Sequence, residues 1–170
     1  RIDAFGALFQ TAIADGYATK LGLTNRTPDD IALIQDFLTV MANGEADFTL
    51  TFRALSDTAE TPDKEPELRA LFTKTVPLDD WLARWRQRLE KESRTASQIA
   101  TAMRSANPVI IPRNHQIEAA IKAAVSSNDL GPFHRLVDEL ARPFDDRPGI
   151  DDLKLPPKPE EIVHATFCGT

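Results

Sequence analysis

Glycine is scarce in this chain, and its distribution limits what the chain can fold into. Only 7 of the 170 residues are glycine, and none lies between Gly44 and Gly131. Phosphate-binding loops need clustered glycines so that backbone N–H groups can approach the ligand, and neither G-x-G-x-x-G nor G-x-x-x-x-G-K-[ST] is present. An all-β fold would need more turn glycines and more Val, Ile and Tyr. The sequence therefore predicts an all-α protein.

Apolar residues recur at helical spacing along most of the chain, which predicts an irregular multi-helix domain of about seven or eight helices. The clearest start is Thr27, which can cap a helix that opens with Pro28. Segment 48–55 also alternates as a strand would, and we interpret it as a helix because its neighbours are helical. The expected helices cover about residues 3–21, 28–43, 48–55, 68–72, 79–92, 95–105, 113–126 and 132–142, and residues 57–66 are expected to form a surface loop.

Each expected helix carries an apolar stripe that we predict to be buried. Trp81 and Trp85 lie four residues apart, and Leu89 continues their stripe. Stripes on other helices contain Phe5, Phe9 and Ile13; Ile31, Ile34, Leu38 and Met41; Ile117, Ala120, Ile121 and Ala124; and Phe133, Leu136, Val137 and Leu140. Because only a short polar segment separates the last two helices, we expect them to pair as a helical hairpin.

Proline divides the chain into two expected parts. Five prolines fall within residues 143–159, and proline cannot continue a helix because it lacks the backbone N–H. We therefore predict a helical domain over residues 1–142. The expected second part, residues 143–170, is an irregular Pro-rich tail that ends in Cys168 and two small residues.

Charge and hydropathy exclude several classes of partner. The chain has 20 Lys and Arg against 26 Asp and Glu, a net charge of -6, whereas nucleic-acid-binding domains carry a basic face. The basic residues of segment 84–91 alternate with Glu90 and Glu92, as on a solvated helix face. No apolar run approaches the length that spans a bilayer, and no signal peptide is visible. We expect neither a nucleic acid nor a membrane as a partner.

No set of side chains resembles a catalytic or metal centre. His115 and Glu118 form a single His-x-x-Glu pair, whereas zinc needs three or four converging ligands. Asp145-Asp146 and Asp151-Asp152 fit turn chemistry better than a paired acid and base. We therefore assign no catalytic, cofactor-binding or metal-ligating residue. Cys168 is the candidate redox or regulatory residue, because a thiolate on a flexible arm needs only reach and no rigid pocket.

Several segments resemble the selenoprotein O family. The longest runs from Met103 to Ile121, where Asn107-Pro108, a few apolar residues and Arg113-Asn114 precede a helix with an Ala-Ile pair. Pro143-Phe144-Asp145 matches the Pro-aromatic-Asp that ends the family's hairpin. The resemblance extends backward through Ala46–Thr49, Phe52–Leu55 and Lys20–Leu23, and so covers essentially the whole chain in the right order.

The resemblance implies a protein adenylyltransferase. Members of the family have a pseudokinase domain that binds ATP in an inverted orientation and transfers AMP to protein Ser, Thr or Tyr hydroxyl groups (AMPylation). ATP and Mg²⁺ would bind a kinase-like domain upstream of Arg1, which agrees with the missing glycine loop. This chain would then be the C-terminal helical part, without activity by itself and with a structural and regulatory role. Its partners would be that upstream domain and the parent enzyme's protein substrates.

The resemblance also bears on the chain end and on the cell compartment. Family members often end in a cysteine or selenocysteine followed by two small residues, as in Cys168-Gly169-Thr170. Selenocysteine-containing members have a cysteine three residues earlier, where this chain has Ala165. A redox partner of Cys168 would therefore lie in the upstream domain or in another protein. The expected location is the bacterial cytoplasm, or the mitochondrion if the source is a eukaryote.

Two pairs of interpretations stay open on the sequence. Asn107 and Asn114 can cap helix ends while Arg113 bridges carbonyl groups within the chain. Alternatively, Arg113 reaches the kinase-like domain and locks the two parts together, since interface arginines are often energetic anchors. For the chain as a whole, the alternative to a part of an adenylyltransferase is a free-standing helical protein-interaction module without enzymatic activity.

Overall fold

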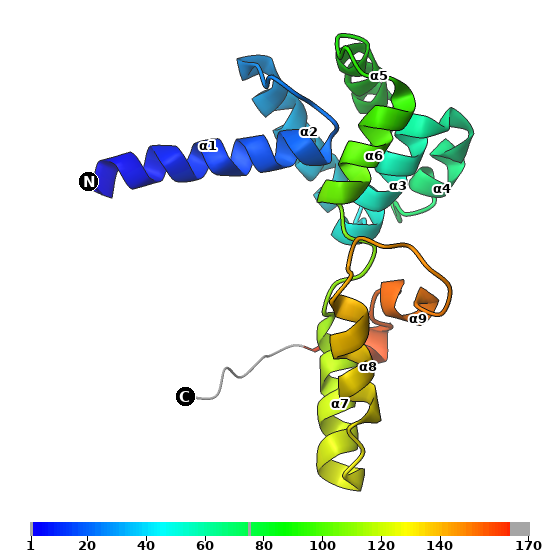
Figure 1. Cartoon of the computed structure of the whole chain (residues 1–170). Helices are drawn as coiled ribbons and strands as arrows, with labels where there is room; N and C mark the ends of the chain where they lie inside the picture. Colours follow the sequence, from blue (N-terminus) through cyan, green and yellow to red (C-terminus); the bar gives the residue numbers. More distant parts are fainter. Residues whose placement is uncertain (1, 75, 164–170) are drawn as a thin grey trace. The chain divides into compact units, whose positions relative to one another are not determined.

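A computed structural model describes residues 2–74 and 76–163, and in these residues it contains helices and no strand (Figure 1). The all-α prediction is therefore confirmed. The α-helices of this described part are α1 (Ile2–Lys20), α2 (Pro28–Asn43), α3 (Phe48–Glu60), α4 (Glu65–Arg69), α5 (Leu78–Leu89), α6 (Ala96–Ala106), α7 (Asn114–Ser127), α8 (Gly131–Leu140) and α9 (Asp151–Lys154). Short 3-10 helices occupy Pro62–Lys64 and Pro159–Glu161.

The chain divides at Asn107 and Pro108 into two compact units, one with α1 to α6 and one with α7 to α9. The distribution of proline predicts this division after residue 142 instead. In the structure the Pro-rich segment packs with α7 and α8, and the backbone N–H groups of Val109 and Ile110 donate to the carbonyl oxygen of Pro143 at 2.8 and 3.3 Å. Ile150 and Leu153 are buried in the same small core. Part of the expected irregular tail is therefore a packed element of the second unit.

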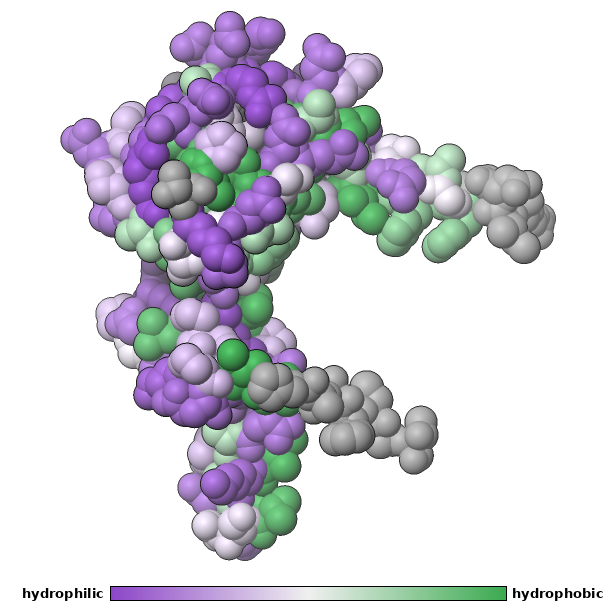
Figure 2. Space-filling model, turned by 180° about the vertical axis from the view of Figure 1, so that it is seen from behind, coloured by the Kyte–Doolittle hydropathy of each residue, from purple (hydrophilic) through white to green (hydrophobic). Residues whose placement is uncertain are grey.

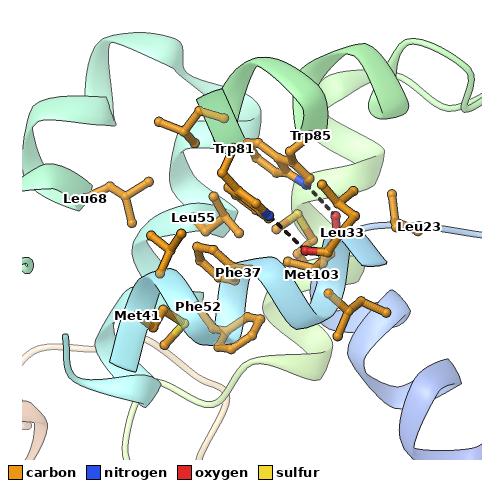
Figure 3. Packing of buried hydrophobic residues seen from close by; sticks show 14 of the residues in the cluster. Leu23, Leu33, Phe37, Met41, Phe52, Leu55, Leu68, Trp81, Trp85 and Met103 are labelled. Atoms are coloured by element: carbon orange, nitrogen blue, oxygen red, sulfur yellow. Dashed lines mark hydrogen bonds between the residues drawn. The ribbon is translucent and has the colours of Figure 1, made fainter. Parts of the chain in front are cut away.

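Two tryptophans on α5 form the centre of the first unit's core (Figure 3). Trp81 and Trp85 are 0% and 1% exposed, and the Trp81 ring stacks on Phe37 with 3.9 Å between centroids. Their indole N–H groups donate to the carbonyl oxygens of Leu33 and Leu21 at 2.9 and 3.0 Å. The predicted tryptophan stripe is confirmed, and it attaches α5 both to α2 and to the end of α1.

The end of α1 also lies close to α6. Gly22 has a φ of +78°, the left-handed conformation that commonly ends a helix. A Cβ atom at this position would lie 2.7 Å from the Ile99 side chain. Only glycine satisfies both the backbone conformation and this close approach.

Two sequence predictions about the first unit are wrong. Residues 57–66 are not a loop, because α3 continues to Glu60 and short helices follow at Pro62 and Glu65. Pro62 and Pro66 lie in the first turns of those helices, where the missing N–H costs nothing. On α2 the predicted stripe is confirmed at Ile34 and Met41, but Ile31 is exposed. Leu33, Phe37 and Val40 are buried as well, so α2 buries a wider face than predicted; it contacts both α1 and α5.

Three predicted apolar stripes are largely uncovered. On α1, Phe5 and Phe9 are 67% and 51% exposed. On α7 and α8, Ile121, Phe133 and Val137 are 51%, 50% and 51% exposed, although Ala120 is buried. Helical periodicity was correct here, but burial also requires a second surface. The described residues do not cover these faces.

A buried ion network joins the start of α2 to the end of α5. Arg88 Nε donates to Asp30 Oδ1 at 2.7 Å, and Arg88 Nη1 donates to Glu92 Oε1 at 2.9 Å. The Asp30 and Glu92 side chains are each only 2% exposed. Burial by itself would raise the pKa of both carboxyl groups. Hydrogen bonds, chiefly from Arg88 and Thr27 to Asp30 and from Thr24 and Arg94 to Glu92, outweigh burial and hold both pKa values below their usual range.

Replacing Trp85 tests the centre of the core. We expect Trp85→Ala to lower the unfolding free energy of the first unit by about 3–5 kcal/mol, because it leaves a large cavity and an unpaired Leu21 carbonyl. The control is Phe9→Ala at a half-exposed position, with an expected change within about 0.5 kcal/mol. Denaturant unfolding measures the stability of both variants. It is followed by tryptophan fluorescence, which comes from Trp81 alone in Trp85→Ala and from both tryptophans in Phe9→Ala. Equal effects of the two substitutions would contradict this assignment of the core.

The ion network provides a second test with a control on the same helix. Arg88→Met leaves the buried Asp30 carboxylate without its main partner and removes one of the partners of Glu92, so we expect a loss of about 3–5 kcal/mol. Arg84 pairs with Asp36 at the surface, where the side chains are 50% and 49% exposed. Arg84→Met should therefore cost at most about 1 kcal/mol. A similar loss of unfolding free energy in both variants would show that the buried ion pair stabilises the unit no more than the surface pair does.

The same network predicts how stability depends on pH. Because the pKa values of Asp30 and Glu92 are lowered in the folded state, their contribution is complete above the unfolded-state values, about 4 to 4.5. It is lost as pH falls further, since the unfolded state then binds more protons. We expect the unfolding free energy of the parent chain to fall more steeply below this pH than that of Arg88→Met. Parallel pH profiles would contradict the assignment.

Candidate functional site: a buried polar cluster at Asn107

The side chain of Asn107 lies at the point where three helices meet. The residue follows α6, is fully buried and precedes Pro108. Its Nδ2 donates to the carbonyl oxygen of Lys20 at 2.9 Å and to Ser56 Oγ at 3.1 Å. The last carbonyl groups of a helix have no partner within the helix, so this amide satisfies the end of α1 while it also contacts α3.

Two cations complete this cluster at the end of α6. Lys20 Nζ donates to the Ala106 carbonyl oxygen at 3.0 Å and to Asn107 Oδ1 at 3.2 Å. It also lies 5.5 Å from the centre of the Phe52 ring, and burial lowers its pKa. Arg53 Nη1 donates to the Asn107 carbonyl oxygen at 3.2 Å. Positive groups stabilise a helix at its C-terminal end, where unpaired carbonyl groups concentrate negative charge.

Three of the segments that carry the family resemblance therefore meet in space. Lys20, Arg53 and Asn107 each belong to a different one of them, and their hydrogen bonds converge on the last turn of α6. Sequence reasoning named Asn107 but missed Lys20, Arg53 and Ser56 as its partners. The available signal was weak: a lysine in the last turn of a helix often bonds carbonyl groups, but nothing indicates which helix supplies them.

Arg113 and Asn114 lie at the start of α7 in the second unit. Arg113 is 8% exposed, and its Nη2 donates to the Lys154 carbonyl oxygen at 2.9 Å. This bond joins the start of α7 to the end of α9. It agrees with the interpretation in which Arg113 binds carbonyl groups of this chain. The capping position is occupied by Arg113, and Asn114 is the exposed first residue of the helix. The expectation that Asn114 caps α7 is therefore wrong.

The acidic pairs near α9 form surface ion pairs. Arg135 Nη1 donates to Asp152 Oδ2 at 2.6 Å, and this bond is the main cause that lowers the pKa of Asp152. Lys154 Nζ donates to Asp146 and Asp151 at 2.7 and 2.9 Å. Asp146, Asp151 and Asp152 thus each pair with a cation. Over residues 2–74 and 76–163, no group of three or more His, Cys, Asp or Glu side chains is arranged to hold a metal ion.

The chemistry of the Asn107 cluster is that of a structural joint. Its ammonium, guanidinium and amide groups donate to the carbonyl oxygens of Lys20, Ala106 and Asn107 and to the Ser56 hydroxyl group. Catalysis by acid and base would instead need a nucleophile within hydrogen-bond reach of a base. Cys168, the candidate redox residue, lies outside the described residues, so its role stays a prediction. Among the described helices, none combines the length and the apolar character that crossing a membrane requires.

Removing the Asn107 amide tests the joint. We expect Asn107→Ala to lower the unfolding free energy of the first unit by about 1–3 kcal/mol, because buried partners on α1 and α3 lose their hydrogen bonds. Asn114→Ala, at an exposed position close by in the sequence, should change stability by at most about 0.5 kcal/mol. Denaturant unfolding measures both variants. An unchanged unfolding free energy in Asn107→Ala would show that the cluster contributes little to the stability of the first unit.

Comparison with known proteins identifies the family. A family model described as "Protein adenylyltransferase SelO" matches residues 1–141. Proteins named "Protein nucleotidyltransferase YdiU" are similar over nearly the whole chain: 48% identity in Rhodopseudomonas palustris BisB5 and 50% in Bradyrhizobium sp. BTAi1, each over 99% of this chain, and 46% in Rhizobium meliloti 1021 over 98%. In all three relatives the match covers 34% of the relative, so the chain spans about a third of their length. The resemblance found in the sequence is confirmed: the chain belongs to the SelO family.

Proposed function

We propose that this chain is the C-terminal helical part of a SelO-type protein adenylyltransferase and that it supports the kinase-like domain of the same polypeptide. The observation that carries the proposal is the pattern of coverage. Relatives named protein nucleotidyltransferases match 99% of this chain but only 34% of their own length. A part of a larger enzyme explains this pattern better than a free-standing interaction module does.

The proposal divides the work between two parts of one polypeptide. ATP and Mg²⁺ bind outside these residues, where the α-phosphorus of ATP is attacked by a protein hydroxyl group and pyrophosphate leaves. This chain contributes a rigid helical support. The tryptophan core and the Asn107 joint favour that role, because both are built from well-paired buried groups. The partners are then the kinase-like domain and the parent enzyme's protein substrates.

Regulation and location complete the proposal. Cys168 is proposed to regulate the parent enzyme through thiol chemistry, with a partner outside this chain, because no second cysteine exists within it. The relatives named above come from bacteria. Their source favours the bacterial cytoplasm over the mitochondrion as the proposed location.

Two labels on ATP test the proposed activity. The isolated chain and the longer polypeptide that contains it are each incubated with Mg²⁺, a test protein and ATP labelled at either the α- or the γ-phosphate. We expect the longer polypeptide to transfer only the α-label, since AMP transfer releases the γ-phosphate in pyrophosphate. The isolated chain should transfer neither label. Transfer of the γ-label, labelling by the isolated chain, or no labelling by the longer polypeptide would contradict the proposal.

A further inference from the structure

An uncovered apolar groove runs between α7 and α8. It has a volume of about 490 Å³, and every residue that lines it is apolar. Its walls include Ile117 and Ile121 from α7 and Phe133 and Val137 from α8. Ile121, Phe133 and Val137 are each about half exposed, and Figure 2 shows hydrophobic surface along this hairpin. Such a concentration of apolar surface on one face indicates a contact with another element.

The geometry of the groove fits a helix. α7 and α8 pack against each other as a hairpin whose turn begins at Asn128, with a φ of +51°. The α7 wall extends from Ile117 to Ala124, which corresponds to about 10 Å or two helical turns. A groove between two such helices accepts the side-chain ridge of a third. The occupant would present apolar residues at helical spacing over at least two turns.

Two charged side chains of α8 pair with residues on the side away from the groove. Arg135 pairs with Asp152 and donates to the Gly149 carbonyl oxygen, and Glu139 pairs with Arg147. Leu136 and Leu140 also pack against the small core that contains Ile150 and Leu153. The segment 147–153 therefore covers one side of α8, whereas the groove side is left without a cover among the described residues.

The composition of the groove favours a permanent occupant. Permanent interfaces resemble a protein core cut in half, whereas sites for separate ligands usually combine an apolar wall with a few polar groups that fix orientation. This groove has no polar residue in its wall. About two thirds of the length of the relatives lies outside the matched region, so the proposed polypeptide has ample chain to supply an occupant.

We infer that a helix from the part of the longer polypeptide outside these residues packs into the groove between α7 and α8. The inference rests on the proposed function only in that the chain is part of a longer polypeptide. It goes further by naming the surface that joins the two parts and the kind of element that covers it. A second copy of this chain and the segment 164–170 of the same chain are the competing occupants.

Cysteine accessibility tests this inference with a matched pair of positions on α7. Ile121 lines the groove, whereas Val125 is 82% exposed and does not. Ile121→Cys and Val125→Cys are each introduced with Cys168→Ser, and maleimide labelling at the new cysteine is followed by peptide mass spectrometry. In the longer polypeptide we expect labelling at position 121 to be slower than at position 125 by about tenfold or more, because only local opening exposes it. In the isolated chain the two rates should be similar.

Three other labelling outcomes would overturn the inference. Equal rates in the longer polypeptide would show that the groove stays uncovered. Protection in the isolated chain that increases with protein concentration would identify a second copy as the occupant. Protection that is independent of concentration and is lost when residues 164–170 are removed would identify the chain's own end. Failure of AMP transfer by a longer polypeptide that protects position 121 would reject the proposed activity and leave the docking intact.

Discussion

The buried side-chain amide of Asn107 is the interaction that joins α1, α3 and α6 at one point. It joins residues more than fifty positions apart, because it donates to the end of α1 at Lys20 and to α3 at Ser56 while it ends α6. Lys20 returns two hydrogen bonds to the same place. The Asn107 side chain is shielded from water, so a hydrogen bond that it fails to make would cost more than an exposed one. The tryptophan core then holds α5 against the same end of α1.

Sequence reasoning predicted local structure well and tertiary relationships poorly. Thr27 and Pro28 marked the start of α2, and the spacing of Trp81 and Trp85 predicted a buried pair, since both signals are local. The cluster around Asn107 could not be predicted, because its partners are fixed by how helices pack and not by spacing in the chain. Periodicity likewise identified the stripes of α7 and α8, but it could not show that Phe133 and Val137 lack a cover among the described residues. The N-cap of α7 is Arg113, one residue before the predicted Asn114. Sequence signals locate helix ends only to within one or two residues.

The two units thus differ in how much of their core is covered. In the first, Trp81 and Trp85 are fully buried and their indole N–H groups are paired, although Phe5 and Phe9 on α1 are exposed. In the second, a small core around Ile110 and Ile150 lies beside an apolar groove that the described residues leave open. This chain spans only about a third of the length of its relatives. Such a chain is expected to expose an apolar surface, because a surface that is internal to a larger protein becomes external in a part of it.

Backbone hydrogen exchange compared between the isolated chain and the longer polypeptide tests this account most directly. Amides of α3 and α5 should exchange at the same slow rate in both, because their cover lies within the first unit. Amides of α7 and α8 should be protected far more strongly in the longer polypeptide than in the isolated chain. Equal protection of α7 and α8 in both would contradict the claim that this chain is a structural part completed by the rest of its polypeptide.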